Sequence, residues 1–216
     1  MSHILAYIRK DLLLELRRGY ALGGLTVFVL CIVFIIYLSF GEIEGRLWIT
    51  LYWIAFLFIS IHTVLKGFAL ENNNRYLYYY SLLRPEYIFL AKWIYNTCML
   101  VALGMLMYAI LSLVAGNPID DQRIFLLTVI AGAVGISLCF TFVSAIAVKS
   151  DQSATLMTIL SFPLIIPVLL HLIRLSRASL PDTMITDIAT SLITLGSIDL
   201  LLAGLGLLLF PYLWRS

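Results

Sequence analysis

The chain has 216 residues, of which 62% are hydrophobic and only 12% are charged, and its formal net charge is +2. Soluble domains usually carry about a quarter charged residues, so this sequence has too few polar side chains to cover a water-facing globule. The near-neutral charge gives no sign of a nucleic-acid partner. The composition therefore excludes a soluble domain and favours an all-α protein that lies within the lipid bilayer.

Six apolar segments are each long enough to cross a membrane. Each has about 20 residues or a few more, and at about 1.5 Å per residue a helix of that length spans roughly 30 Å of hydrocarbon. We expect transmembrane helices at Gly19–Phe40, Leu47–Leu65, Trp93–Ala115, Ile124–Val148, Ser153–Ile173 and Ile188–Leu213.

The segment before the first span, residues 1–18, is predicted to form an amphipathic helix. Its apolar residues fall on one helical face, and the basic residues Lys10, Arg17 and Arg18 fall on the opposite side. Because a span follows at once, we expect this helix to lie in the membrane surface rather than to pack as a cytosolic helix on a partner. The remainder, residues 19–216, is predicted to be one membrane domain.

The distribution of basic residues predicts the orientation of the chain. With the N-terminus in the cytoplasm, ten of the 14 Lys and Arg residues lie on the inner side and four on the outer side. This excess agrees with the positive-inside rule, and the reverse topology would violate it. An even number of spans then places both termini in the cytoplasm.

The loop between the second and third spans, residues 66–92, combines charged and aromatic side chains more densely than any other loop. Glu71 and Arg75 are four residues apart, as in a helix-borne ion pair, and Pro85 ends the element before the next span. An apolar patch beside these charges favours a docking surface, with a membrane-lying loop as the alternative. The residues that we assign to this surface are Glu71, Arg75, Tyr76, Tyr79, Leu83, Arg84 and Pro85.

Three ionisable residues lie within the predicted spans: His62, His171 and Asp199. The two histidines are near span ends and are interpreted as interfacial residues with polar partners, although an imidazole can also ligate haem iron. Asp199 is near mid-membrane, where a charge is costly, so it should face the bundle, a water-filled cavity or a second copy. It is either a pathway or gating carboxylate or a buried hydrogen-bonding residue, with Ser197 as one partner.

The fifth span contains Pro163 and Pro167, four residues apart. Each proline removes a backbone hydrogen bond and clashes with the preceding turn, so the span is predicted to be kinked. The freed carbonyls must be satisfied by neighbouring helices or water, which places this span inside the bundle. The kink is either purely structural or a mechanical hinge.

No enzyme signature is present. The sequence lacks a phosphate-binding G-x-x-x-x-G-K-[ST] loop, a G-x-S-x-G elbow and an H-E-x-x-H pair. The cysteines Cys31, Cys98 and Cys139 lie inside apolar runs and lack metal-site or disulfide-framework spacing. We therefore expect a protein without catalytic residues, bound metal or bound cofactor.

The sequence resembles a known family in several stretches. The second-loop pattern matches that of type-2 ABC exporter permeases at Glu71, Arg75, Leu77, Leu82, Leu83, Pro85 and Lys92. Further matches to the CcmB family, also called haem exporter protein B, are Lys10–Arg17, Leu90–Lys92, Phe162–Pro167 and Leu209–Arg215. The length and the expected topology are also similar to those of this family.

The resemblance implies a permease half in the bacterial inner membrane that pairs with a second copy and with two ATP-hydrolysing subunits. It also implies association with other cytochrome c maturation proteins, haem as the substrate of the complex, and ATP bound only by the partner subunit. The complex would either move haem or use ATP to release a haem-loaded chaperone.

Two other functions are compatible with the residues. One is a type-2 permease that exports a lipid, drug or polysaccharide. The other is an ion-coupled secondary transporter that uses Asp199, which would be supported by broken helices in two related halves, a symmetry that the sequence does not display.

Overall fold

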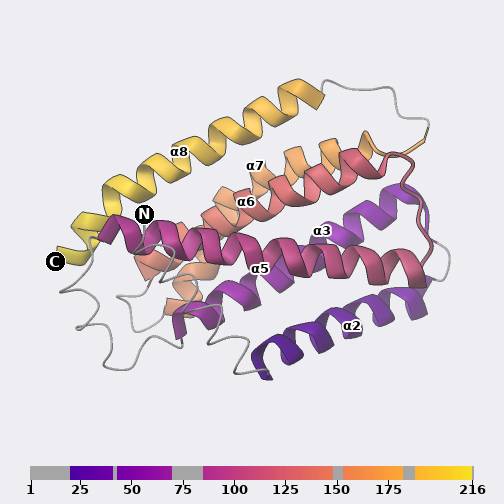
Figure 1. The fold of residues 1–216 in the computed structure, drawn as a ribbon, viewed down its shortest axis with the longest axis horizontal. Helices are drawn as coiled ribbons and strands as arrows, with labels where there is room; N and C mark the ends of the chain where they lie inside the picture. Colours follow the sequence, from indigo (N-terminus) through magenta and orange to yellow (C-terminus); the bar gives the residue numbers. More distant parts are fainter. Residues whose placement is uncertain (1–19, 41–42, 70–84, 148–152, 182–187, 216) are drawn as a thin grey trace.

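The computed structural model describes residues 20–40, 43–69, 85–147, 153–181 and 188–215. Nearly all of these residues lie in six long helices (Figure 1). The helices are α2 (Tyr20–Phe40), α3 (Gly45–Ala69), α5 (Pro85–Val114), α6 (Gln122–Ala147), α7 (Ser153–Arg177) and α8 (Ile188–Arg215).

All six helices contain an apolar stretch long enough to cross a membrane, so the prediction of an all-α protein with six candidate spans is confirmed for the described residues. The predicted amphipathic helix, residues 1–18, lies outside the described residues. The clearest difference is α5, which begins at Pro85, eight residues before the predicted span start at Trp93. Proline suits the first position of a helix because its missing N–H would have no intrahelical partner there, and Glu86 in the first turn favours the helix dipole.

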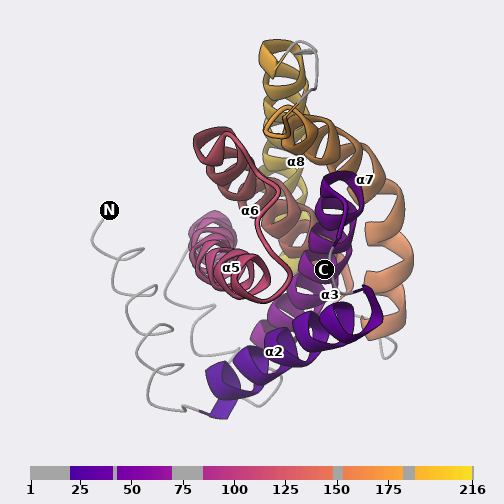
Figure 2. The same cartoon turned by 90° about the vertical axis from the view of Figure 1, so that its right-hand side faces the viewer.

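Helix α6 lies at the centre of the bundle, and α2 and α8 lie at its margins. Two thirds of the apolar stretch of α6 is buried, against 22% for α2 and 17% for α8. The end-on view shows α8 and α2 at opposite edges, with the other helices between them (Figure 2). The margins of one chain therefore present large apolar surfaces, as expected where lipid or another subunit covers them.

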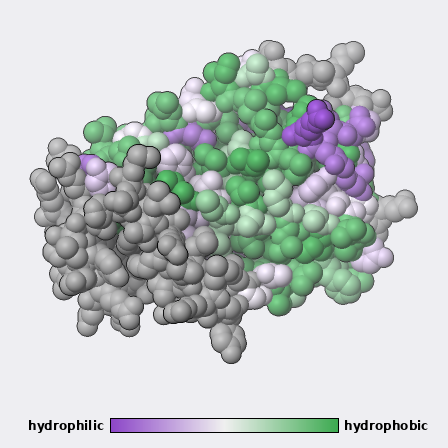
Figure 3. Space-filling view, viewed as in Figure 1, coloured by the Kyte–Doolittle hydropathy of each residue, from purple (hydrophilic) through white to green (hydrophobic). Residues whose placement is uncertain are grey.

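The bundle has two different ends. At one, which we call the turn end, α2, α5 and α7 finish; at the other, the terminus end, α8 finishes (Figure 1). Hydrophilic side chains gather at the turn end in the space-filling view, beside a broad apolar surface (Figure 3).

Hydrogen bonds fasten the connections at the turn end to one another. The backbone N–H groups of Asp120 and Asp121 donate to the Ser179 carbonyl, at 2.9 and 3.2 Å. The indole of Trp48 donates to the carbonyl of Gly116 at 3.1 Å, and Gly116 has a φ of +77°, which glycine adopts without a steric penalty. The α5–α6 turn is thus held against both α3 and the end of α7.

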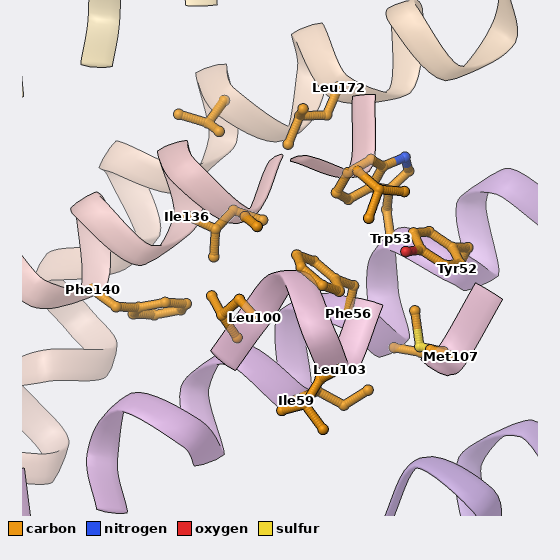
Figure 4. Packing of buried hydrophobic residues seen from close by; sticks show 14 of the residues in the cluster. Tyr52, Trp53, Phe56, Ile59, Leu100, Leu103, Met107, Ile136, Phe140 and Leu172 are labelled. Carbon is orange, nitrogen blue, oxygen red and sulfur yellow. The ribbon is translucent and has the colours of Figure 1, made fainter. Parts of the chain in front are cut away.

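An aromatic row on α3 fills the interior near the turn end. Tyr52, Trp53 and Phe56 are buried and point toward α5, α6 and α7 (Figure 4). The Tyr52 hydroxyl donates to the Gly104 carbonyl at 3.1 Å, and the Trp53 indole donates to the Ser176 hydroxyl at 2.8 Å. Since lipid is as apolar as these side chains, close packing and such hydrogen bonds hold the helices together.

A second set of polar contacts joins α5 to α6. The Asn96 amide donates to the Thr141 hydroxyl at 2.9 Å, and the hydroxyls of Thr97 and Ser137 lie 2.7 Å apart. Asn96 is buried, so its amide would be costly in hydrocarbon without this partner. These buried polar groups have internal partners and support the fold.

Candidate functional site

Asp199 lies at the middle of the bundle, where α6, α7 and α8 meet. It is eleven residues after the start and ten before the end of the apolar stretch of α8. Its Oδ1 atom is 2.9 Å from the position that a Cβ on Gly135 would occupy, and a Val168 methyl group is 3.3 Å from that position. The carboxyl therefore packs on a glycine of α6 beside the midpoint of α7, and we call Gly135, Cys139, Val168 and Asp199 the junction.

The Oδ1 atom of Asp199 is buried and accepts no hydrogen bond from the residues that the structure describes. Ser197 is not its partner, because the Ser197 hydroxyl donates to the Ile193 carbonyl of its own helix at 2.7 Å. That candidate pairing is therefore absent. Asp199 is unlike Asn96, which lies in the same bundle and has a partner.

Pro163 and Pro167 lie inside α7, which continues through both of them. Because Pro167 has no N–H, the carbonyl of Pro163 loses its intrahelical donor, and Pro163 does the same to the carbonyl of Ile159. Leu164, between the prolines, directs its carbonyl toward the Cys139 thiol of α6, with an S–O distance of 3.9 Å. The weakened segment of α7 is thus in contact with the junction.

The two histidines lie on different helices, and neither is one of the four residues that define the junction. His62 is exposed on α3, and its ring meets Phe28 of α2 edge-on at a centroid distance of 4.9 Å. His171 is half-buried on α7, with Nδ1 2.8 Å from the Pro167 carbonyl. Since a carbonyl only accepts, Nδ1 carries the hydrogen and the lone pair resides on Nε2. No group of three His, Cys, Asp or Glu residues able to hold a metal occurs in the described ranges.

The comparisons with known proteins identify the family. The model of the CcmB protein family matches residues 2–212. The chain belongs to the CcmB family. Among curated proteins, none is similar enough to count as a match.

Membership in the CcmB family assigns the chain to the permease of the cytochrome c maturation haem exporter. The CcmB permease is not catalytic, and the ATPase of the exporter is a separate subunit, CcmA. The alternatives of a different export substrate and of an ion-coupled transporter are therefore not supported.

The docking surface predicted for this CcmB-family permease falls largely outside the described residues. Glu71, Arg75, Tyr76, Tyr79, Leu83 and Arg84 all lie in the range 70–84. Pro85, assigned to the same surface, is the first residue of α5. Helices α3 and α5 flank this range, and both meet it at the terminus end (Figure 1).

The sequence pattern points to Asp199 but not to the residues around it. Gly135 and Cys139 come from α6 and Val168 comes from α7, so only packing brings them to the carboxyl. The involvement of Gly135 could have been predicted from the sequence. Gly132 and Gly135 place two small residues in the middle of an apolar segment, and small residues mark close helix contacts in membranes.

Proposed function

We propose that this chain is one half of a homodimeric inner-membrane permease whose terminus end faces the cytoplasm and receives the ATP-hydrolysing subunit on residues 66–92. The observation that carries the docking proposal is the continuity of two helices. Helix α3 runs to Ala69, five residues beyond its apolar stretch, and α5 is helical from Pro85 onward. A push on the segment between them is then transmitted along two long helices rather than absorbed in flexible chain.

Both of these helices are fastened to other helices of the bundle. Tyr52 of α3 is hydrogen-bonded to α5, and Trp53 is hydrogen-bonded to α7. A displacement of α3 must therefore move α5 and α7 with it, because packed interiors transmit displacement rather than deform continuously. This supports the range 66–92 as the point where ATP binding and hydrolysis act on the membrane helices.

The surface of the bundle supports a second copy of the chain as partner. Buried aromatic side chains occupy the interior between α3, α5 and α6, so cargo has no evident space inside this part of the bundle. Helix α8 instead exposes large apolar side chains, namely Ile193, Leu200, Leu201 and Leu208. We infer that haem, or a haem-loaded chaperone, is handled at the surface of the permease, between two copies or against other maturation proteins.

Co-purification tests the assignment to an ATP-driven complex. A tagged form of the chain, extracted from native membranes in mild detergent, should recover a P-loop ATPase, and the recovered complex should hydrolyse ATP. A six-span membrane protein of another family with the same tag is the control. Recovery of the permease without any ATPase would reject the proposal.

Cysteine labelling tests the orientation. In a chain without its natural cysteines, a cysteine at Asn73 should be protected from a membrane-impermeant maleimide in intact spheroplasts, and a cysteine at Asp182 should be modified. The expected difference follows from the excess of basic residues in the sequence segments that are predicted to be cytoplasmic. Modification of a cysteine at Asn73 from the outside would contradict the predicted orientation.

A further inference from the structure

The carboxyl of Asp199 is placed where it cannot easily stabilise the fold. At mid-membrane an acidic side chain is costly, and a buried polar atom without a hydrogen bond adds to that cost. Its Oδ1 atom is buried and has no donor in the described ranges of the chain. An apolar side chain of similar size would avoid both costs, so stability alone does not account for this residue.

The packing around the carboxyl shows how the chain accommodates it. A Cβ on Gly135 would come within 2.9 Å of Oδ1 and 3.5 Å of Oδ2, so the absence of a side chain at Gly135 leaves the space that the carboxyl occupies. Gly135 and Asp199 are separated by a long stretch of chain, and they meet only through the contact of α6 with α8. The Asp199 carboxyl therefore fits the space that the glycine at position 135 leaves free.

The part of α7 that lines the junction is the segment with the two prolines, where the backbone hydrogen bonding of the helix is interrupted. Val168 follows Pro167 directly, and Leu164 lies between Pro163 and Pro167. The prolines remove two backbone donors here, so this segment can bend at lower cost than an uninterrupted helix. A bend at this point would move Val168 and Leu164 relative to Gly135 and Cys139, which they contact.

We propose that Asp199 is a positioning residue of the transport cycle: water enters the junction when α7 bends at Pro163–Pro167 and donates the hydrogen bond that the carboxyl lacks in the closed bundle. The Asp199 carboxyl accepts a hydrogen bond from this water, and the Pro163 carbonyl of α7, whose intrahelical donor is missing, can be hydrated as the helix bends. Hydration of the junction then stabilises the more strongly bent form of α7 relative to the form in the described structure. This inference rests on the proposed function, since the ATPase subunit drives the bend.

The first experiment separates a functional carboxyl from a structural one by measuring thermal stability and function together. Asp199→Leu should raise the unfolding midpoint of the purified complex by about 2–6 °C, because it removes an unpaired buried polar group. It should also lower the yield of c-type cytochrome by about tenfold, the loss expected for one strong hydrogen bond. Asp199→Asn should keep at least about half of the yield, since an amide oxygen still accepts from water.

Asn96 provides the matched control. It is a buried polar residue of the same bundle whose amide has a partner, so Asn96→Leu should lower the unfolding midpoint. A lower midpoint for Asp199→Leu, like that of the control, would overturn the proposal in favour of a structural role. Full cytochrome yield in Asp199→Leu, or equal losses in the Leu and Asn variants, would overturn it as well.

The second experiment detects the water itself. Cys139 is buried in the junction, whereas Cys31 and Cys98 are exposed and can be replaced by Ala. A charged methanethiosulfonate reagent reacts with thiolate in water, so it should modify Cys139 at least about tenfold faster during ATP turnover than in the nucleotide-free complex. If ATP turnover is normal and Cys139 reacts equally slowly in both states, the proposal that water enters the junction is wrong, while the proposed function stands.

Discussion

The double substitution Tyr79→Ala and Leu83→Ala is expected to remove most of the ATPase subunit from the purified complex while membrane insertion stays normal. Tyr76, Tyr79 and Leu83 recur at helical spacing, so they share one face if residues 71–85 bind as a helix. Truncating two anchors of an interface costs about 2 kcal/mol or more each, which corresponds to at least about a 30-fold loss in affinity per anchor. Pull-down yield, ATP turnover and c-type cytochrome content measure the effect.

Charge reversal at the same surface gives an independent variant. Glu71→Lys should weaken binding without removing any apolar area, and its effect should diminish at high ionic strength. Tyr78→Ala is the matched control, because Tyr78 would point away from the face of Tyr79 if this segment binds as a helix, so binding should be unchanged. ATPase recovery and turnover at wild-type levels in both test variants would place the docking site elsewhere.

Replacing Gly132 by Ala is expected to destabilise the bundle strongly. A Cβ at this position would lie 2.5 and 2.7 Å from two ring atoms of Trp53 and 3.2 Å from a Leu172 methyl group. Trp53 cannot yield easily, because its indole donates to Ser176 and its ring packs edge-on against Tyr52 and Phe56. Overpacking of this kind costs about 1–3 kcal/mol. We expect a lower unfolding midpoint and less folded protein in the membrane.

Gly196→Ala is the control for this effect. Gly196 is an exposed glycine within α8, and a Cβ there meets no atom within 4 Å. The substitution should therefore be neutral or slightly stabilising, since alanine favours a helix more than glycine does. Equal stability of the two variants would show that the contact of α3 with α6 at Gly132 is looser than the structure indicates.

Composition and hydropathy were sufficient to predict the class of the protein and the number and approximate position of its candidate spans. This was possible because a bilayer requires about 20 consecutive apolar residues per helix, and that requirement is local in the chain. The start of α5 was predicted less well, since Pro85 was interpreted as a break. A proline is equally suited to the first position of a helix, and no local rule distinguishes the two.

The surroundings of each polar residue within the spans depend on how the helices pack and could not be predicted from the sequence. The sequence predicted that Asp199 should face the bundle, a cavity or a second copy, and packing placed its carboxyl against Gly135 beside the double-proline segment of α7. Likewise, Asn96 and Asp199 are both polar residues in apolar helices, yet the Asn96 amide donates a hydrogen bond to Thr141, whereas Oδ1 of Asp199 accepts none from the described residues. The physical reason is that hydropathy depends on each residue and its near neighbours, whereas a hydrogen-bond partner comes from another helix and exists only once the helices have packed.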